Sequence, residues 1–275
     1  MAWFLRTNVQ AVSLWGAAPI GARRWRGVQK VLMITGGSRG IGYAVAEAYA
    51  RLGYAVALSG HADRERLDEA VAGLKRIQPA ASGELVDVRD ARAVARWVDD
   101  VAGRFGRIDV AVSNAGVIHP APFLELSEGQ WDEVVGTHLK GTFLFLRSVA
   151  RVMVEKRTGG SLITVTAPTA VRGGEGVADY ASAKGGILAL TRNMAKELAS
   201  HGIRVNSVLP VAETRMTDAL IRYRKIDPEA WNRRFPLSGG MPSARDVVGP
   251  FLFLGSDDSK YVTGNVITVD AGSGL

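Results

Sequence analysis

Two side chains that together could act as an acid/base pair lie four residues apart in the second half of the chain. They are Tyr180 and Lys184, in the segment Tyr-Ala-Ser-Ala-Lys. On a helix this spacing puts both side chains on one face, so the phenol and the ammonium can approach the same site. A nearby cation favours the phenolate, and lowering a tyrosine pKa from about 10 by about two to three units needs roughly 3–4 kcal/mol. We therefore predict that Lys184 lowers the pKa of Tyr180, which exchanges a proton with a substrate oxygen.

A glycine-rich turn follows the first apolar run of the fold. Residues 35–42 read Thr-Gly-Gly-Ser-Arg-Gly-Ile-Gly, between the apolar run 31–35 and a helical pattern over 40–52. Glycine permits a tight turn and lets the backbone approach a pyrophosphate, whose charge is met by the amides at a helix N-terminus. A strand, a glycine turn and a helix in this order predict a dinucleotide site.

These motifs, with further segments in order along the chain, resemble the short-chain dehydrogenase/reductase family, and within it the 3-oxoacyl-[acyl-carrier-protein] reductase-like members. The further segments are Ser113–Gly116, similar to the family's Asn-Asn-Ala-Gly, the pair Asp87–Val88, and the closing segments 261–264 and 269–270. The resemblance covers roughly residues 31–275. It implies hydride transfer between a nicotinamide dinucleotide and a carbonyl or secondary alcohol, with Lys184 also holding the nicotinamide ribose.

The resemblance also implies a set of site residues. The predicted catalytic residues are Tyr180, Lys184 and His138, and no metal site is expected. The predicted cofactor-binding residues come from the glycine turn, the strand ends that follow it, the catalytic helix and the start of a substrate lid: Gly36, Ser38, Arg39, Gly40, Ile41, Gly42, His61, Asp87, Val88, Asn114, Ala115, Gly116, Tyr180, Lys184, Pro210 and Thr214.

The end of the second expected strand bears on the choice of cofactor. An acidic residue there would accept hydrogen bonds from a ribose 2′-hydroxyl and favour NAD(H), but Gly60 takes that place. His61 and Arg39 would instead offer positive charge to a 2′-phosphate. We therefore expect NADP(H) in preference to NAD(H), which stays possible because Asp63 follows closely.

Three positions depart from the family pattern. Ala167 stands thirteen residues before Tyr180, where the family has a serine, and Thr166 or Thr169 could substitute if the loop shifts register. His138 stands where the family has an asparagine of the proton relay. A neutral imidazole could take over the relay, and an ordinary helix histidine is the equal alternative. Val211 replaces the usual glycine beside the nicotinamide pocket.

Short β-rich runs alternate with longer helical stretches from Val31 onward. Strands are expected at 31–35, 54–59, 84–88, 108–113, 161–166, 203–208 and 266–269, with long helices around 128–155 and 179–200. Strands separated by helices imply a parallel sheet covered on both faces. We predict one α/β domain over residues 31–275, with a doubly wound Rossmann fold and seven parallel strands.

The charge and the amino-acid composition exclude several kinds of partner and site. The chain has 275 residues and a formal net charge of +7, but residues 1–30 hold five bases and no acid, and the rest has 29 bases and 27 acids. We therefore expect neither nucleic acid nor a membrane as partner. The absence of cysteine excludes disulfides and thiolate metal sites. Residues 1–30 are interpreted as a basic extension outside the fold of a cytoplasmic protein, with a transit peptide for organelle import as the alternative.

Two function classes remain open. In the first, the protein is an NADP(H)-dependent oxidoreductase acting on a small carbonyl or alcohol, or on an acyl thioester, and forms a homodimer or homotetramer. In the second, the missing serine and asparagine mark a dinucleotide-binding sensor or partner subunit without dehydrogenase turnover. The intact Tyr180–Lys184 pair favours the first.

Overall fold

Seven apolar segments of the chain form a single sheet. The structure is a computed structural model that describes residues 29–237 and 239–274, so the predicted extension 1–30 lies outside the described residues except for its last two. The strands are β1 (Val31–Thr35), β2 (Ala55–Gly60), β3 (Ser82–Leu85), β4 (Val110–Ser113), β5 (Gly160–Val165), β6 (Ile203–Pro210) and β7 (Val266–Val269).

The strand order of this sheet is β3-β2-β1-β4-β5-β6-β7, and all neighbours are parallel. The chain winds from β1 outward to β3, then returns to β4 on the other side of β1. The connections on the two sides of β1 therefore diverge, which opens a crevice beyond the carboxyl ends of β1 and β4. The predicted doubly wound Rossmann fold is confirmed.

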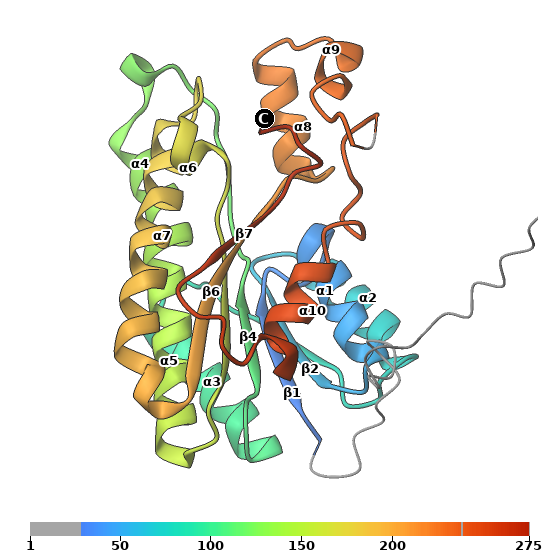
Figure 1. The fold of residues 1–275 in the computed structure, drawn as a ribbon, viewed down its shortest axis with the longest axis vertical. Coiled ribbons are helices and arrows are strands. Elements are labelled where there is room, and N and C mark those ends of the chain that lie inside the picture. Colours follow the sequence, from blue (N-terminus) through green and yellow to red (C-terminus); the bar gives the residue numbers. More distant parts are fainter. Residues whose placement is uncertain (1–28, 238, 275) are drawn as a thin grey trace, which may run out of the picture.

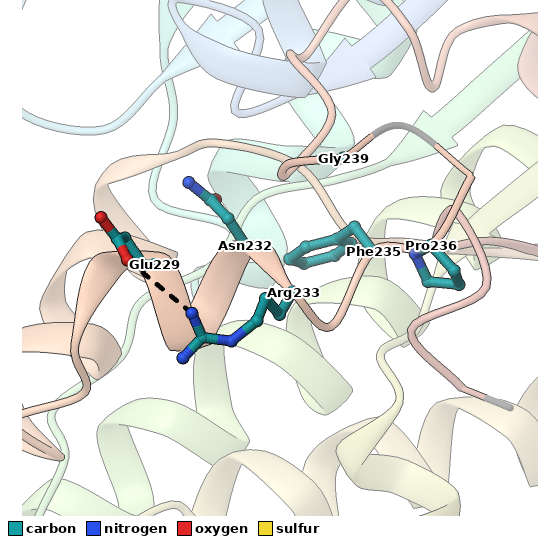
Figure 2. A pocket seen from close by; sticks show the side chains of 6 residues that line it. All are labelled: Glu229, Asn232, Arg233, Phe235, Pro236 and Gly239. Atoms are coloured by element: carbon teal, nitrogen blue, oxygen red, sulfur yellow. Dashed lines mark ion pairs between the residues drawn. The ribbon is translucent and has the colours of Figure 1, made fainter.

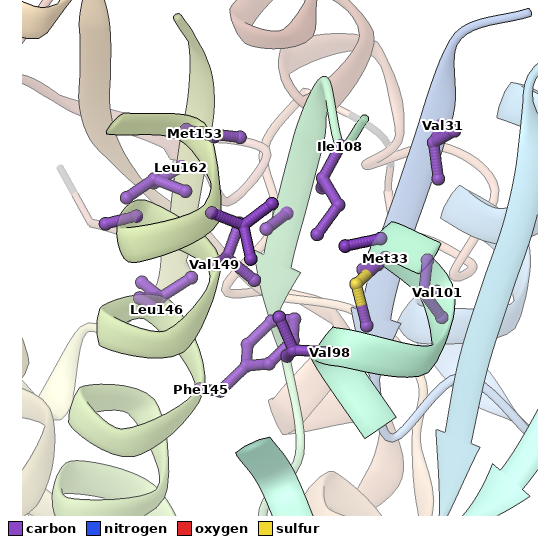
Figure 3. Close-up of a cluster of buried hydrophobic side chains, with 14 of the residues drawn as sticks. Val31, Met33, Val98, Val101, Ile108, Phe145, Leu146, Val149, Met153 and Leu162 are labelled. Carbon is purple, nitrogen blue, oxygen red and sulfur yellow. The ribbon is translucent and has the colours of Figure 1, made fainter. Parts of the chain in front are cut away.

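Successive residues of β1 pack into the hydrophobic clusters on opposite faces of the sheet. Val31 and Met33 belong to the hydrophobic cluster on one face of the sheet, and Leu32 and Ile34 to the cluster on the other. The first cluster, part of which is drawn in Figure 3, also includes Phe145. Its ring stacks on that of Trp97 at a centroid distance of 5.5 Å. Burial on both faces explains why the strands read as unbroken apolar runs.

Helices cover both faces of the sheet (Figure 1). One face is covered by α3 (Ala91–Phe105), α5 (Gly141–Lys156) and α7 (Ala178–Leu198), and the other by α1 (Gly40–Arg51), α2 (Arg64–Lys75) and α10 (Gly249–Gly255). Beyond the end of the sheet lie α8 (Arg215–Tyr223) and α9 (Pro228–Asn232), beside the last described residues of the chain. They belong to the segment, from about 214 to 242, that the family resemblance predicts as the substrate lid, and this segment is called the lid below. The shorter elements are η1 (Phe123–Glu125), α4 (Glu128–Val135), the π-helical turn η2 (Gly136–Lys140), α6 (Thr169–Arg172), η3 (Ala199–His201) and η4 (Asp257–Ser259).

Two predicted elements differ from the structure. The third strand was expected at 84–88 but spans Ser82–Leu85, because Val86 and Val88 are buried in the loop that leaves the sheet. The single helix expected around 128–155 is interrupted by η2. Turns of this kind widen a helix by one residue, and here the widened turn carries the buried side chain of His138.

Neither a membrane span nor a metal centre is found in the part of the chain that the structure describes. None of its helices combines the length and apolarity that crossing a bilayer requires. Residues 29–237 and 239–274 also contain no group of three or more His, Asp or Glu side chains placed to hold a metal ion.

Candidate active site

The glycine turn and the segment after β4 are joined at the crevice. Thr35 Oγ1 accepts hydrogen bonds from the backbone amides of Asn114 at 3.0 Å and Ala115 at 3.1 Å. In return, the Asn114 side chain donates to the backbone oxygens of Thr35 and Gly36, at 3.2 and 3.0 Å. Gly36 has a φ of +64°, and an added β-carbon there would lie 2.8 Å from Ala115 Cα. Only glycine fits at this point.

The N-terminus of α1 faces this turn without a side-chain cap. Arg39 precedes the helix, is exposed, and makes no capping hydrogen bond. The uncapped amides and the helix dipole together suit a phosphate group. An added β-carbon on Gly42 would lie 2.3 Å from the backbone oxygen of Gly36, so the start of α1 packs directly against the turn. These residues fit a dinucleotide pyrophosphate.

The adenosine end of the predicted site contains an ion pair that the sequence did not predict. The Asp87 carboxylate accepts hydrogen bonds from the Arg89 side chain at 2.7–3.1 Å and from its backbone amide at 2.9 Å. The hydrogen bonds to the Arg89 side chain lower the pKa of Asp87, and the charge of His61 lowers it further. The side chain of Val88 is buried, so this residue can offer a ligand little but its backbone.

The acidic residue that closely follows β2 is engaged as a helix cap. Gly60 is the last residue of β2, and His61 beyond it is exposed. Asp63 instead caps α2, because its carboxylate accepts a hydrogen bond from the Arg66 amide at 2.9 Å.

Tyr180 and Lys184 lie on the first two turns of α7, as predicted. Lys184 Nζ donates to the backbone oxygen of Val165 at 2.7 Å and lies 5.5 Å from the centroid of the Tyr180 ring. Burial lowers the pKa of Lys184 to about 7 and raises the pKa of Tyr180 above its usual value of 10. The predicted lowering of the Tyr180 pKa is therefore not seen in the free protein. Desolvation of the phenol by burial is the cause of the higher pKa.

His138 lies against Tyr180 from the π-helical turn. The two rings meet edge to face at a centroid distance of 5.0 Å. His138 Nε2 lies 2.7 Å from the backbone oxygen and 3.1 Å from the amide nitrogen of Val117, whereas the buried Nδ1 has no partner among the described residues. Burial, and then the charge of Lys184, lower the pKa of His138 to about 3. His138 is thus neutral near pH 7, so a relay through it cannot begin from an imidazolium.

The other two departures from the family pattern, Ala167 and Val211, affect the site differently. Ala167 is buried at the end of β5 and supplies no hydroxyl, while Thr166 Oγ1 donates to the backbone oxygen of Lys184 at 3.2 Å. Val211 replaces glycine without strain, since its φ is not positive and its amide donates to the Val269 oxygen at 2.9 Å. Pro210 ends β6 directly before it.

Comparisons with known proteins agree with this geometry. A family model described as "Enoyl-(Acyl carrier protein) reductase" matches residues 36–273. The chain is 36% identical over 244 residues to a 3-oxoacyl-[acyl-carrier-protein] reductase FabG of Thermotoga maritima, an alignment covering 88% of this chain and 97% of that protein. The chain belongs to the short-chain dehydrogenase/reductase family.

Further relatives extend over the same range. A FabG reductase of Chlamydia trachomatis is 34% identical over 253 residues, covering 89% of this chain and 97% of that protein. A solved structure of carveol dehydrogenase from Mycobacterium avium in complex with NAD superposes with a TM-score of 0.83 at 28% identity, covering 90% of this chain and 98% of that one. The chain is therefore an oxidoreductase of this family, and a nicotinamide dinucleotide is its cofactor.

The lid lies beside the glycine turn at one end and is hydrogen-bonded to the loop before Tyr180 at the other. Thr214 caps α8, and its methyl group lies 3.8 Å from the point where a β-carbon on Gly40 would stand. At the other end of α8, Arg224 donates from Nε and Nη2 to the backbone oxygen of Glu175, at 3.1 and 2.7 Å.

The lid also contains a cavity of about 450 Å³ (Figure 2). Its wall includes Phe235 and the pair Glu229–Arg233, whose charged atoms lie 3.8 Å apart. The complete lining is Glu229, Asn232, Arg233, Phe235, Pro236 and Gly239. No predicted catalytic residue lines this cavity.

Sequence reasoning missed three contributors to the site. Thr35 joins the two halves of the crevice, Arg89 neutralises Asp87, and Arg224 attaches the lid. Only Arg89 had a local signal, because a cation two residues beyond a carboxylate in a turn can reach back to it. The other two contacts span 79 and 49 residues.

Proposed function

We propose that this protein is an NADP(H)-dependent oxidoreductase that interconverts a carbonyl and a secondary alcohol, with Tyr180 as the acid/base and Lys184 as its electrostatic partner. The observation that carries the proposal is the meeting of Tyr180, Lys184 and His138 beside the crevice at the carboxyl ends of the strands. Buried titratable groups with strongly shifted pKa values concentrate where chemistry is done.

The charge around the adenosine ribose supports NADP(H) over NAD(H). Arg39 and His61 are exposed, and Asp63 is engaged in capping α2. Arg89 forms an ion pair with Asp87, a carboxylate that also interacts with His61. A 2′-phosphate would thus meet positive charge.

The bound dinucleotide would supply or accept the hydride, and the residues of this chain handle the rest of the reaction. The glycine turn and the N-terminus of α1 would hold the pyrophosphate, with Asn114 and Thr35 keeping the crevice in shape. Lys184 would hold the nicotinamide ribose hydroxyls. Tyr180 would pass its proton to the substrate oxygen during reduction and take it back during oxidation.

For the substrate we propose a β-ketoacyl thioester or a related apolar ketone. The relatives are named as reductases of 3-oxoacyl groups carried on acyl carrier protein. The lid of this chain places exposed bases near the crevice, among them Arg222 and Lys225, which suit an anionic carrier. Exposed apolar residues on α4 and α5, Trp131 and Phe143, favour a homodimer or homotetramer.

The test is NADPH oxidation against a panel of ketones, β-ketoacyl thioesters and quinones, with a Tyr180→Phe variant beside the wild type. We expect turnover of at least one carbonyl by the wild type and a loss of at least about 10²-fold in the variant. Dinucleotide binding, measured by fluorescence titration, should be nearly equal in both. Equal rates in both proteins on every substrate, or binding without any turnover, would favour the sensor or partner-subunit alternative.

A further inference from the structure

Two buried hydroxyls join the end of β4 to the π-helical turn η2. Thr142 Oγ1 donates to the backbone oxygen of His138 at 2.6 Å, and Ser113 Oγ lies 2.9 Å from Thr142 Oγ1. A hydroxyl has a single hydrogen, and a carbonyl oxygen can only accept. The hydrogen of Thr142 therefore points to His138, and Ser113 is the donor in its contact with Thr142. The hydrogen bonds run in one direction, from the strand to the carbonyl of His138.

This chain of hydrogen bonds ends at the irregular part of the helix. The Gly141 amide donates to the Gly136 oxygen, five residues earlier, which is the hydrogen bond of a π-helical turn. Thr142 follows directly, and a threonine hydroxyl that bonds to the carbonyl four residues before it bends a helix. Ser113 and Thr142 are both buried, so bulk water does not compete for their hydrogen bonds. The two residues therefore hold the place where η2 passes into α5.

The π-helical turn packs closely against its neighbours, so His138 has little room to move. A β-carbon on Gly116 would lie 2.2 Å from His138 Cε1, which places the imidazole directly on that glycine. The same imidazole meets the Tyr180 ring edge to face, at a centroid distance of 5.0 Å. The turn touches α7 a second time, because a β-carbon on Gly186 would lie 2.7 Å from Leu139 Cδ2. A shift of the turn is therefore passed to the helix that carries Tyr180.

We propose that Ser113 and Thr142 are positioning residues of the reaction, because they hold η2 so that the imidazole of His138 sets the Tyr180 ring for proton transfer. This inference rests on the proposed carbonyl chemistry. Both hydroxyls are buried, so they act through His138 and not on the substrate. Without the Thr142 hydroxyl the turn is free to shift, and the imidazole no longer fixes the phenol. A misplacement of about 1 Å can lower a rate by about 10²-fold.

Helix α7 contains the same arrangement of hydroxyls at a regular turn, and this provides a matched control. Thr191 Oγ1 donates to the backbone oxygen of Ile187, four residues earlier, at 2.7 Å, and lies 2.8 Å from Thr164 Oγ1 of β5. Both threonines are buried, like the first pair. Removing a hydroxyl from either pair breaks similar hydrogen bonds, but only the first pair leads to His138.

The experiment measures kcat at saturating NADPH with the carbonyl substrate that the wild type turns over best. We expect Thr142→Val to lower kcat by about tenfold or more, and Thr142→Ser, which keeps the hydroxyl, to stay within about twofold of the wild type. Ser113→Ala leaves the hydrogen bond from Thr142 to His138 in place and should lower kcat by only about threefold. The Kd for NADPH, measured by fluorescence titration, should stay within about twofold in all three variants.

Thr191→Val separates positioning from a loss of stability. In urea it should lower the free energy of unfolding by about as much as Thr142→Val does, because both leave a buried carbonyl and a buried hydroxyl with one partner fewer. Its kcat should stay within about twofold of the wild type. If Thr142→Val is too unstable to assay, Ser113→Ala is compared with Thr164→Val in the same way, and an equal kcat in that pair contradicts the proposal.

Failure of this inference can be told apart from failure of the proposed function. If the wild type turns over a carbonyl and Thr142→Val loses no more kcat than Thr191→Val does, these hydroxyls do not position Tyr180 and the proposed function stands. The same conclusion holds if Thr142→Ser is as slow as Thr142→Val. If the wild type turns over no carbonyl at all, the proposed function fails and the positioning role fails with it.

Discussion

The guanidinium of Arg224 in the lid donates two hydrogen bonds to the backbone oxygen of Glu175, in the loop that leads to Tyr180. Tyr223 strengthens this contact, since its ring lies 2.3 Å from the place of a β-carbon on Gly176. The lid is therefore attached to the loop before any ligand is bound, and opening it must break a charge-assisted pair of hydrogen bonds.

Removing this attachment should loosen the lid. We expect Arg224→Ala to speed amide hydrogen exchange in α8 by about tenfold, the equivalent of about 1.4 kcal/mol, and to raise KM for the carbonyl substrate more than it changes the Kd for NADPH. Arg222→Ala removes an exposed guanidinium from the same helix and is the matched control for the exchange measurement alone. Equal exchange rates in the two variants would show that the contact does not hold the lid.

The buried, neutral imidazole of His138 should make stability depend on pH. Its pKa is about 3 in the folded protein, against 6.5 for an ordinary histidine. Below about pH 6.5 the unfolded chain binds a proton that the folded one does not, so stability is complete above this pH. It falls as the pH drops toward 3, at up to about 1.4 kcal/mol per pH unit from this group.

Urea denaturation of the free protein between about pH 4.5 and pH 6.5 measures this effect. His138→Asn removes the titrating group, so the free energy of unfolding should change less with pH in the variant than in the wild type, by about 2 kcal/mol over the interval. His61→Asn, which removes an exposed imidazole, is the matched variant for comparison. Parallel pH profiles for wild type and His138→Asn would contradict the buried, neutral state of His138.

The sheet could be read from the sequence because its signals are local. Apolar runs bounded by turns located the strands, and β1 shows why, since its residues are buried on alternate faces of the sheet. The third strand was placed two residues late because Val86 and Val88 are as apolar as a strand, although the chain has already left the sheet there. The pattern of apolar residues in a sequence indicates which residues are buried. Burial continues here beyond the last residue that is hydrogen-bonded in the sheet, so the pattern misplaces the end of the strand.

The site could be predicted in part, for the same reason. Tyr180, Lys184 and the glycine turn are sequence motifs, and their neighbourhood follows from the fold. The electrostatics of the pair could not be predicted, because they depend on how deeply the pair is buried and on the acceptor at Val165, nineteen residues from Lys184. The four-residue spacing places Tyr180 and Lys184 on the same face of a helix, but it does not say which other residues surround that face.

Adding an acid at the end of β2 should shift the cofactor preference toward NADH. Gly60 has room for a β-carbon, whose nearest contacts would be at 3.5 Å, and His61 is exposed. Gly60→Asp and His61→Asp should each weaken NADPH binding by about tenfold or more through repulsion of the 2′-phosphate, while NADH binding is kept or improved. Fluorescence titration of both dinucleotides measures the ratio.

Gly103→Asp adds the same charge in an open position on α3 and should leave the ratio unchanged. A wild type that binds NADH tenfold tighter than NADPH would overturn the proposed preference. A ratio unmoved by either acidic variant would mean that this end of β2 does not meet the ribose.

Thr35 should be the most costly polar side chain to remove from the crevice. Its hydroxyl is almost fully buried and is the acceptor for two backbone amides, those of Asn114 and Ala115. Thr35→Val keeps the shape of the side chain but leaves both donors unpaired, which should lower the free energy of unfolding by about 2–4 kcal/mol. Thr35→Ser keeps the acceptor and should cost only the packing of one methyl group, about 1 kcal/mol.

Urea denaturation of both variants measures this difference in the free energy of unfolding. Thr35→Val should also weaken dinucleotide binding, because these amides fix the segment beside the glycine turn. If the valine variant proved as stable as the serine variant, the amides must find water or another acceptor, and the junction of the two halves would rest on the Asn114 side chain alone.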